Sequence, residues 1–383
     1  MKERIPRKPR QSYFVTCAPG LEPTLHGEIR ALRLAKVERQ VGGVYFEGDR
    51  ADAMLANLEL RTAVRVLERV ARFRADDSDA LYEATLALEW RKYLKDGQSL
   101  LVAAHTKESA LDHTLFIEQR VKDAICDGLR ASGRERPSVE KDDPDLRVHV
   151  HIFRDRCTLL VDTSGESLHK RGWRSFQGKA PLSETLAAGL VLLSGWDRRS
   201  PVIDPFCGSG TLLVEAALIA DDVAPGLFRK DFGFQRMPDY DAALWTKMVE
   251  AARKRIRPAR KMPMIGLDAR HDILEGAEEN LLSAGLEGRI EFATSDARET
   301  ELRPGWNGLL LTNPPYGERV GEERDLVPLY KEVGNRWRKQ GKGYSIALFS
   351  GNPRLDSRLG IEFKQRIALK NGSLECELLV GAL

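Results

Sequence analysis

The hydrophobic pattern divides the chain into two halves, and the first half mixes strands with helices. Short apolar runs bounded by turn residues predict strands at 12–19, 42–48, 99–106 and 146–165. The last run is long enough for two strands, with a turn at Arg154 and Asp155. Apolar residues at helical spacing predict helices over 21–32, 50–70 and 114–133. This interleaving predicts small α+β modules over residues 11–160.

The second half alternates strand and helix. Residues 170–196 connect the halves, and Pro181 lies where the first turn of a helix over 182–196 is expected. Beyond it, the pattern predicts strands at 201–206, 264–268, 289–296, 308–315 and 344–350, and helices at 210–220, 272–284 and 325–340. Two further β runs follow at 362–369 and 375–381. Short apolar strands separated by helices predict a doubly wound parallel sheet.

Composition narrows the class of protein. With 383 residues, 42% hydrophobic and 31% charged, the chain is typical of a soluble globular protein with two or three domains. No apolar run approaches the roughly 20 residues of a membrane span, and the basic N-terminus lacks the apolar stretch of a secretory signal. The five cysteines are scattered and form no CxxC pair, which disfavours a disulfide framework or zinc site. A reducing cytoplasm is the expected location.

Positive charge is concentrated in three clusters, although the net charge is only +3. The clusters lie at 4–10, 169–174 and 252–261. Each one alone is compatible with ordinary solvated surface. Three in one chain favour a polyanionic partner without identifying it.

A glycine-containing turn follows the first strand of the second half. Ligands of parallel α/β sheets bind at the carboxyl ends of the strands. The sequence there is DPFCGSGT (204–211), where Gly208 and Gly210 allow a tight turn and close approach of a ligand to the backbone. The phosphate-loop pattern GxxxxGK[ST] is absent, which disfavours nucleotide hydrolysis. A dinucleotide-binding turn would have a third glycine where Leu213 stands.

Carboxylates end the next two strands. Asp268 stands where a carboxylate can accept hydrogen bonds from both ribose hydroxyls of a nucleoside, and Asp296 stands where it can meet an adenine amino group. A single aspartate at a strand end also serves as a helix cap or turn residue. Together, the glycine-containing turn and the two carboxylates favour an adenosine derivative as the ligand, bound without contacts to a polyphosphate.

The fourth strand ends in Asn313-Pro314-Pro315-Tyr316. Two prolines remove two backbone donors and fix the chain, so the strand cannot continue. The asparagine oxygen and a backbone carbonyl can accept hydrogen bonds from an amino group, while Tyr316 stacks on the ring that carries it. Two such acceptors help to localise the nitrogen lone pair toward an electrophile. The alternative is a rigid turn with a buried tyrosine.

These four strand ends resemble the motifs of class I S-adenosylmethionine-dependent methyltransferases, and NPPY resembles the signature of the branch that methylates amino nitrogens. The wider chain resembles the ribosomal RNA large-subunit guanine-N2 methyltransferases, through VDTSGESLHKRGWR, APLSETLAAGL, DPFCGSGTLLVEAA, TNPPYGERV and NGSLEC. The resemblance implies a ferredoxin-like segment (1–50), a THUMP RNA-binding domain (51–160), a linker with a leading helix (161–195) and a Rossmann-like methyltransferase domain (196–383). A second methyltransferase domain, to which these enzymes can be fused, is not implied.

The resemblance also assigns roles. It places S-adenosylmethionine against the residues Asp204, Phe206, Gly208, Gly210, Thr211, Asp268 and Asp296. It assigns presentation of guanine N2 to Asn313, Pro314, Pro315 and Tyr316. The implied reaction is direct, metal-free methyl transfer to 23S ribosomal RNA. Lys170, Arg171 and Arg174 are candidate RNA contacts, with linkage between domains as the alternative.

Other functions remain open. Transfer RNA guanine-N2 methylation is the nearest, because THUMP domains also serve tRNA enzymes. Adenine-N6 methylation and methylation of a protein glutamine amide also suit NPPY, and a non-catalytic RNA-binding assembly factor is a different class. A nucleophilic Cys207 is disfavoured because it lies in the cofactor turn, and a metal at His149 and His151 because no third ligand is apparent.

Overall fold

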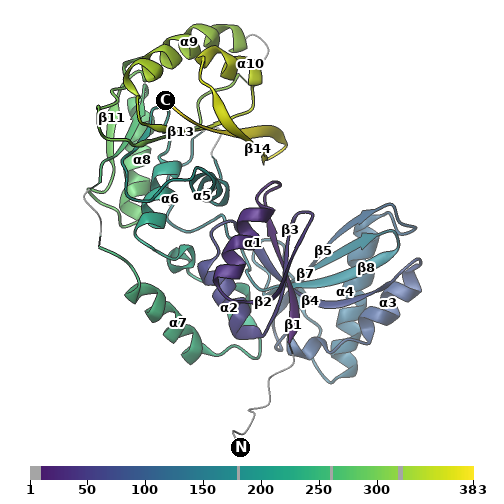
Figure 1. The fold of residues 1–383 in the computed structure, drawn as a ribbon. Helices are drawn as coiled ribbons and strands as arrows, with labels where there is room; N and C mark the ends of the chain where they lie inside the picture. The colour runs from purple at the N-terminus through teal and green to yellow at the C-terminus, as the bar shows by residue number, and fades with distance from the viewer. Residues whose placement is uncertain (1–9, 179–181, 259–261, 318–321) are drawn as a thin grey trace, which may run out of the picture. The chain divides into compact units, whose positions relative to one another are not determined.

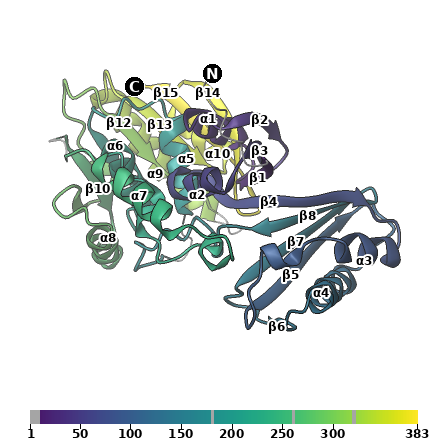
Figure 2. The same cartoon turned by 90° about the horizontal axis from the view of Figure 1, so that it is seen from below.

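The computed structural model describes residues 10–178, 182–258, 262–317 and 322–383. The chain forms two compact units (Figures 1 and 2). The N-terminal unit contains residues up to 16, 28–168 and 229–250, and the C-terminal unit contains residues 17–27, 169–228 and 251–383. Pro181, most of the basic cluster at 4–10 and the end of the cluster at 252–261 lie outside the described residues.

The described strands of the first half form one eight-stranded sheet, in the order β2-β3-β1-β4-β8-β7-β5-β6. Its strands are β1 (Gln11–Cys17), β2 (Ala35–Gln40), β3 (Gly43–Gly48), β4 (Ala63–Arg74), β5 (Ser99–Lys107), β6 (Ser138–Val139), β7 (Leu146–Phe153) and β8 (Arg156–Asp162). The helices are α1 (Glu22–Ala31), α2 (Arg50–Glu59), α3 (Ser78–Leu86) and α4 (Thr114–Ala131). The pairs β1–β3, β2–β3, β4–β8 and β7–β8 are antiparallel, while β5 pairs in parallel with β6 and β7.

The predicted helix over 50–70 is wrong in its second part. Helix α2 is capped by Asp49 and ends at Glu59, and the chain then enters β4. The valines at 64, 66 and 70 are β-branched and suit a strand. Their spacing matches a helix locally, but pairing of β4 with β8 and its place beside β1 outweigh that pattern.

The predicted hairpin turn at Arg154 and Asp155 is confirmed. Both residues have positive φ, 49° and 58°, which is the backbone of a two-residue hairpin turn. Phe153 pairs with Arg156 directly across the turn.

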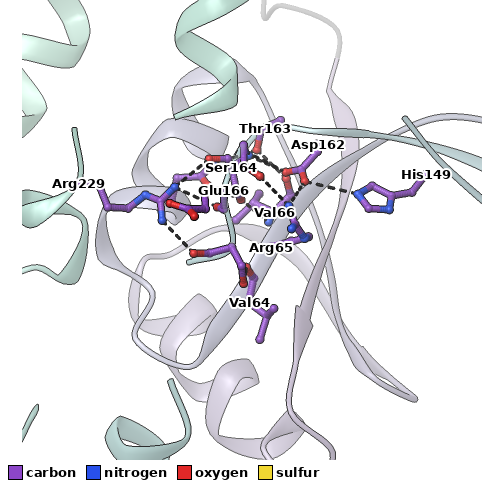
Figure 3. A network of polar contacts seen from close by, with 12 residues as sticks. Val64, Arg65, Val66, His149, Asp162, Thr163, Ser164, Glu166 and Arg229 are labelled. Carbon is purple, nitrogen blue, oxygen red and sulfur yellow. Dashed lines mark hydrogen bonds and ion pairs between the residues drawn. The ribbon is translucent and has the colours of Figure 1, made fainter. Parts of the chain in front are cut away.

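A buried polar network ties the end of β8 to its neighbours (Figure 3). The Asp162 side chain is fully buried, forms an ion pair with Arg65, and lies 3.4 Å from His149 Nε2. Its Oδ1 accepts a hydrogen bond of 2.8 Å from the Ser164 N–H. These partners hold the pKa of Asp162 below its ordinary value although burial opposes ionisation. The chain leaving β8 is therefore fixed by a charged, fully satisfied carboxylate.

Arg229 holds the same segment from the other side (Figure 3). Its guanidinium donates to the carbonyls of Ser164 (3.3 Å), Glu166 (2.9 Å) and Ser167 (3.0 Å). Arg229 begins the stretch 229–250, which groups with the N-terminal unit although it follows the first strand and helix of the methyltransferase-like region. Domains defined as continuous stretches of sequence therefore do not describe this part of the chain.

The described strands of the C-terminal unit form a seven-stranded sheet, in the order β11-β10-β9-β12-β13-β15-β14. They are β9 (Val202–Asp204), β10 (Met264–Asp268), β11 (Glu291–Thr294), β12 (Leu309–Thr312), β13 (Ser345–Ser350), β14 (Phe363–Asn371) and β15 (Leu374–Ala382). The principal helices are α5 (Glu184–Leu193), α6 (Thr211–Ala220), α8 (His271–Ser283) and α9 (Glu322–Gln340). The predicted parallel pairing is confirmed for β9 to β13, while β14 and β15 add an antiparallel edge.

The strand order places a topological switch point between β9 and β12. From β9 the chain moves outward through β10 and β11 on one side, and then returns to build β12 and β13 on the other. In such sheets the crevice at the switch point is the preferred ligand site. The turn at 204–211 and the Asn-Pro-Pro-Tyr turn follow these two central strands.

Candidate active site

A cavity of about 960 Å³ lies at the carboxyl ends of the central strands, within the C-terminal unit. It brings together nearly all the site residues that the sequence predicts. They are Asp204, Phe206, Gly208, Thr211, Asp268, Asp296, Asn313, Pro314, Pro315 and Tyr316. The four strand-end motifs therefore line one cavity, as a single ligand site requires.

The turn after β9 is held by backbone contacts and by two left-handed glycines. Gly208 and Gly210 have φ of 52° and 76°, and Gly210 caps the N-terminus of α6. A Cβ on Gly210 would lie 2.9 Å from the Phe292 ring, whereas one on Gly208 would meet nothing within 4 Å. Gly208 thus leaves the cavity open, and Gly210, which does not line it, is required for packing.

Asp268 links the end of β10 to this turn. Its Oδ2 accepts a hydrogen bond of 3.1 Å from the Gly208 N–H, and its Oδ1 accepts one of 3.0 Å from the Arg270 N–H. A carboxylate oxygen accepts more than one hydrogen bond, so capacity remains for hydroxyl donors. Its position in the cavity suits the predicted contact with ribose.

Asp204 is buried with half of its carboxylate unpaired. Oδ1 accepts hydrogen bonds from the Thr312 hydroxyl (2.7 Å) and the Phe206 N–H (3.1 Å). Oδ2 has no partner among the described residues, and the residue is 1% exposed. Burial, with a smaller contribution from the charge of Asp268, raises the pKa of Asp204 to about 7. A buried acceptor of this kind is complementary to a cationic or N–H donor on a ligand.

Asp296 has a different environment. It caps the short helix Ala297–Glu299, and its two oxygens accept hydrogen bonds of 2.9 and 2.6 Å from the Arg298 guanidinium. Hydrogen bonding to Arg298 lowers the pKa of Asp296. The carboxylate lines the cavity, and its contact with an adenine amino group stays a prediction.

Two of the three candidate RNA contacts, Arg171 and Arg174, have buried side chains. The Arg174 side chain, 6% exposed, pairs with buried Glu184 at 3.1 Å and donates to the Thr211 hydroxyl at 2.8 Å. Arg171 is also buried and lies 3.5 Å from Glu215 in α6. Both guanidinium groups lie beside carboxylates in the interior, which favours the alternative of a structural role. Lys170 is exposed, and its RNA contact stays a prediction.

A sequence signal for these ion pairs was present. Glu184 and Glu215 lie in apolar helices, SETLAAGLVLL and TLLVEAALIA. A carboxylate in a helix that is hydrophobic on every face needs a buried cation. The cluster at 169–174 supplies that cation.

The Asn-Pro-Pro-Tyr turn presents an unused acceptor. Asn313 Oδ1 is buried and has no hydrogen-bond partner among the described residues. The turn itself is fixed by the Tyr330 hydroxyl, which donates to the Pro315 carbonyl at 3.0 Å, and by Asn352 Nδ2, which donates to the Tyr316 carbonyl at 3.2 Å. A buried polar atom without a partner is costly, so this oxygen is a strong indication of a hydrogen-bond donor on a ligand.

Tyr330 and Asn352 were missed by sequence reasoning, because neither belongs to a strand-end motif. Tyr330 reads as a core residue of α9, and it packs in the cluster with Leu310 and Ile346. Only its hydroxyl contact, which the sequence does not reveal, connects it to the site.

The structure also shows the surroundings of the residues named in the two disfavoured alternatives, a nucleophilic Cys207 and a metal at His149 and His151. Cys207 is buried, and burial raises its pKa well above the ordinary value, so a thiolate is suppressed. His151 stacks on His105 and His149 faces Asp162. Within the described ranges, no three His, Cys, Asp or Glu side chains are grouped to hold a metal ion, and no helix is both long and apolar enough to cross a membrane.

Comparisons with known proteins identify the family of the chain. The methyltransferase domain described as RMKL-like matches residues 171–379, a THUMP domain matches 75–162, and a RlmL ferredoxin-like domain matches 12–67. The chain therefore belongs to the RMKL-like methyltransferase-domain family, and its sheet has the class I methyltransferase fold.

Relatives cover nearly the whole chain. The ribosomal RNA large subunit methyltransferase K/L of Syntrophotalea carbinolica is 40% identical over 376 residues, which are 96% of this chain and 53% of that protein. A Synechocystis protein, provisionally named an RNA methyltransferase, is 36% identical over 96% of this chain and 95% of its own length. The chain spans about half the length of the K/L relatives that it matches.

Solved structures also match nearly the whole chain. SMU.472, provisionally named a methyltransferase and crystallised with SAH, has a TM-score of 0.90 and 30% identity, covering 98% of this chain and 99% of that one. A Listeria monocytogenes protein, provisionally named an N6-adenine-specific DNA methylase, has a TM-score of 0.88 and 32% identity, covering 97% and 96%.

Proposed function

We propose that this chain transfers a methyl group from S-adenosylmethionine to the exocyclic N2 of a guanine in large-subunit ribosomal RNA, in the cytoplasm. The observation that carries the proposal is the buried, unpartnered Asn313 Oδ1, which lies on the cavity that Asp204, Gly208 and Asp268 also line. One part of this cavity suits a charged nucleoside-like donor, and another part offers an acceptor to an amino group.

The cofactor half of the cavity fits S-adenosylmethionine. When bound, this cofactor supplies a methyl group activated by a sulfonium. Asp268 would hold the ribose, and Gly208 would let the backbone approach the ligand because it carries no side chain. Asp204 Oδ2 is matched to a positively charged nitrogen, since it is an acceptor buried without a donor.

The other half would prepare the target nitrogen. An exocyclic guanine nitrogen is a weak nucleophile because its lone pair is delocalised into the ring. Asn313 Oδ1 would accept a hydrogen bond from one N–H of the amino group and help to turn the lone pair toward the methyl group, while Tyr316 would stack on the base. A target base inside a helix would first be flipped out, at a cost of a few kcal/mol that stacking partly offsets.

The choice of ribosomal RNA rests on the rest of the chain. The N-terminal unit matches ferredoxin-like and THUMP domains, and the K/L relatives are named as ribosomal RNA methyltransferases. Free RNA and a partly assembled ribosomal particle both present such a guanine. Transfer RNA is the rival substrate of the same chemistry.

A second candidate function is adenine-N6 methylation. The acceptor at Asn313 suits any exocyclic amine, and the Listeria structure carries that activity in its provisional name. The RNA-type N-terminal domains favour guanine in RNA over adenine in DNA.

The identity of the product tests the proposal. The protein would be incubated with S-adenosylmethionine carrying a deuterated methyl group, together with unmodified large-subunit rRNA, both as a free transcript and in partly assembled particles, and with unmodified tRNA transcripts. Digested nucleosides would be analysed by mass spectrometry. We expect labelled N2-methylguanosine from the rRNA. Labelled N6-methyladenosine, labelling confined to tRNA, or no labelled nucleoside would each contradict the proposal.

A further inference from the structure

The hairpin of β14 and β15 brings a residue into the active-site cavity from far along the chain. Strand β14 ends at Asn371, which pairs with Leu374 across a turn containing Gly372, at φ 63°. This is the segment NGSLEC, to which no chemistry is yet assigned. Asn371 lines the cavity, and its Nδ2 lies 3.2 Å from the Tyr316 hydroxyl oxygen.

Tyr316 has contacts with Asn352, Gly351 and Asn371. Its carbonyl accepts a hydrogen bond from Asn352, and its ring lies against Gly351, where a Cβ would come within 3.3 Å of two ring carbons. The contact with Asn371 fixes its hydroxyl. The residue is half-buried and lines the cavity, so a part of its side chain is accessible to a ligand.

The three contacts do different things. The contact with Asn352 fixes only the backbone of the turn, and leaves the two side-chain torsions of Tyr316 free. Gly351 limits the ring on one side. The hydroxyl oxygen is the side-chain atom farthest from the backbone and lies on the axis of the Cβ–Cγ bond, so anchoring it fixes the direction in which the ring points, while Gly351 limits rotation of the ring plane. An amide and a phenol can form this hydrogen bond with either group as donor, because each has a donor and an acceptor.

We propose that Asn371 is a positioning residue for the target base, and that it acts by holding the Tyr316 ring in one direction through the phenol. The proposal rests on the proposed function, in which Tyr316 stacks on the flipped guanine. Stacking directs the amino nitrogen toward the methyl donor only when the ring is held in place, since small errors in alignment slow group transfer strongly. The antiparallel edge of the sheet therefore contributes directly to the reaction geometry.

A double-mutant cycle tests this inference. The variants are Asn371→Ala, Tyr316→Phe and the double variant, with Ser373→Ala at the exposed hairpin tip as the matched control. Rates would be measured with unmodified large-subunit rRNA, affinity for S-adenosylmethionine by calorimetry, and stability by urea unfolding. Loss of one neutral hydrogen bond predicts that Asn371→Ala lowers kcat by about fivefold. The KM for RNA and the affinity for S-adenosylmethionine should stay unchanged, and Ser373→Ala should behave like the unaltered protein.

The cycle separates this role from a merely structural one. If Asn371 acts through the phenol, Asn371→Ala in the Tyr316→Phe background should change kcat by less than about twofold, because the hydrogen bond is already absent. A full fivefold loss in that background, or an unchanged kcat for the single variant Asn371→Ala, would overturn the inference while leaving the proposed function intact. Absence of methyl transfer by the unaltered protein would instead overturn the proposed function, and the inference with it.

Discussion

Replacing Asp204 with asparagine should stabilise the protein increasingly as the pH rises. Asparagine keeps an oxygen for the Thr312 hydroxyl and the Phe206 N–H, and places an amide group where Oδ2 is buried without a partner. The substitution therefore removes a buried charge with little change in shape. Its effect should follow the ionisation of the aspartate.

The sign and size of the effect come from the pKa. Burial raises the pKa of Asp204 from 3.8 to about 7, so the folded protein keeps this proton in a pH range where the unfolded chain has released it. The contribution of Asp204 to the free energy of unfolding is thus greatest below about pH 4. It falls by about 1.4 kcal/mol per pH unit as the pH rises to about 7. The total is about 4 kcal/mol, and Asp204→Asn escapes this loss.

Urea unfolding of both proteins from about pH 5 to about pH 8 measures the difference directly. Other titrating groups are common to both proteins and cancel in the difference. We expect the stability advantage of Asp204→Asn to grow with pH and to level off above about pH 7. A difference that is independent of pH would refute the reasoning, because it would mean that Asp204 does not titrate in this range.

The same variant should be more stable and yet bind its cofactor less well. The ionised Asp204 is the predicted acceptor for a positive charge on the ligand, and hydrogen bonds to charged groups contribute about 1.5–3 kcal/mol. Calorimetry above about pH 7 should therefore show affinity for S-adenosylmethionine lowered by about ten- to a hundredfold. Unaltered affinity would remove Asp204 from the cofactor site.

Two further substitutions test the remaining structural conclusions. Arg174→Ala should lower the free energy of unfolding by about 3–5 kcal/mol, because it leaves buried Glu184 without its cation. The control Lys170→Ala, at an exposed position, should leave the stability unchanged. Weaker RNA binding by Arg174→Ala in a filter assay, with unchanged stability, would contradict this role and support an RNA contact. Gly210→Ala should lower the free energy of unfolding by about 1–3 kcal/mol, which is more than Gly208→Ala should. Both glycines have positive φ, but only Gly210 faces the Phe292 ring. Equal losses of stability in urea unfolding would contradict this explanation.

Local patterns predicted the elements of the C-terminal unit well, for a physical reason. Its central strands are short, apolar and buried on both faces, as in β12 and β13, and each alternates with a helix. Pattern alone could not give the partners of the last two strands, because antiparallel pairing of β14 and β15 depends on which edge of the sheet is open.

The N-terminal unit shows where local pattern fails. Residues 63–70 have apolar spacing compatible with a helix, and only distant strands make them part of β4. Strand β4 also lies beside β1, so the two small modules expected from the sequence share one sheet. Contacts between residues so far apart along the chain leave little trace in a short window of sequence.

The sequence predicted most of the candidate ligand contacts that line the cavity, but it did not predict the residues that support them. Motifs at strand ends located Asp204, Asp268 and Asn313, because chemistry restricts the residue types there. The residues that hold the turn, such as Tyr330 and Asn371, are ordinary members of a helix and a hairpin, and only the fold brings them to the site. Arg171 and Arg174 belong to a basic cluster that resembles a binding surface in the sequence, and only the fold shows that they lie beside the buried acids Glu215 and Glu184.

The most direct test of the central claim separates binding of the donor from use of the target nitrogen. Asn313→Ala removes the unpartnered acceptor and leaves the carboxylates of Asp204 and Asp268 in place. Methyl transfer to RNA and calorimetric affinity for S-adenosylmethionine would be measured on the same preparation. Transfer should fall below detection while the affinity stays within about twofold of the unaltered protein. Retained transfer, or loss of cofactor binding, would contradict the assignment of Asn313 to the target amine.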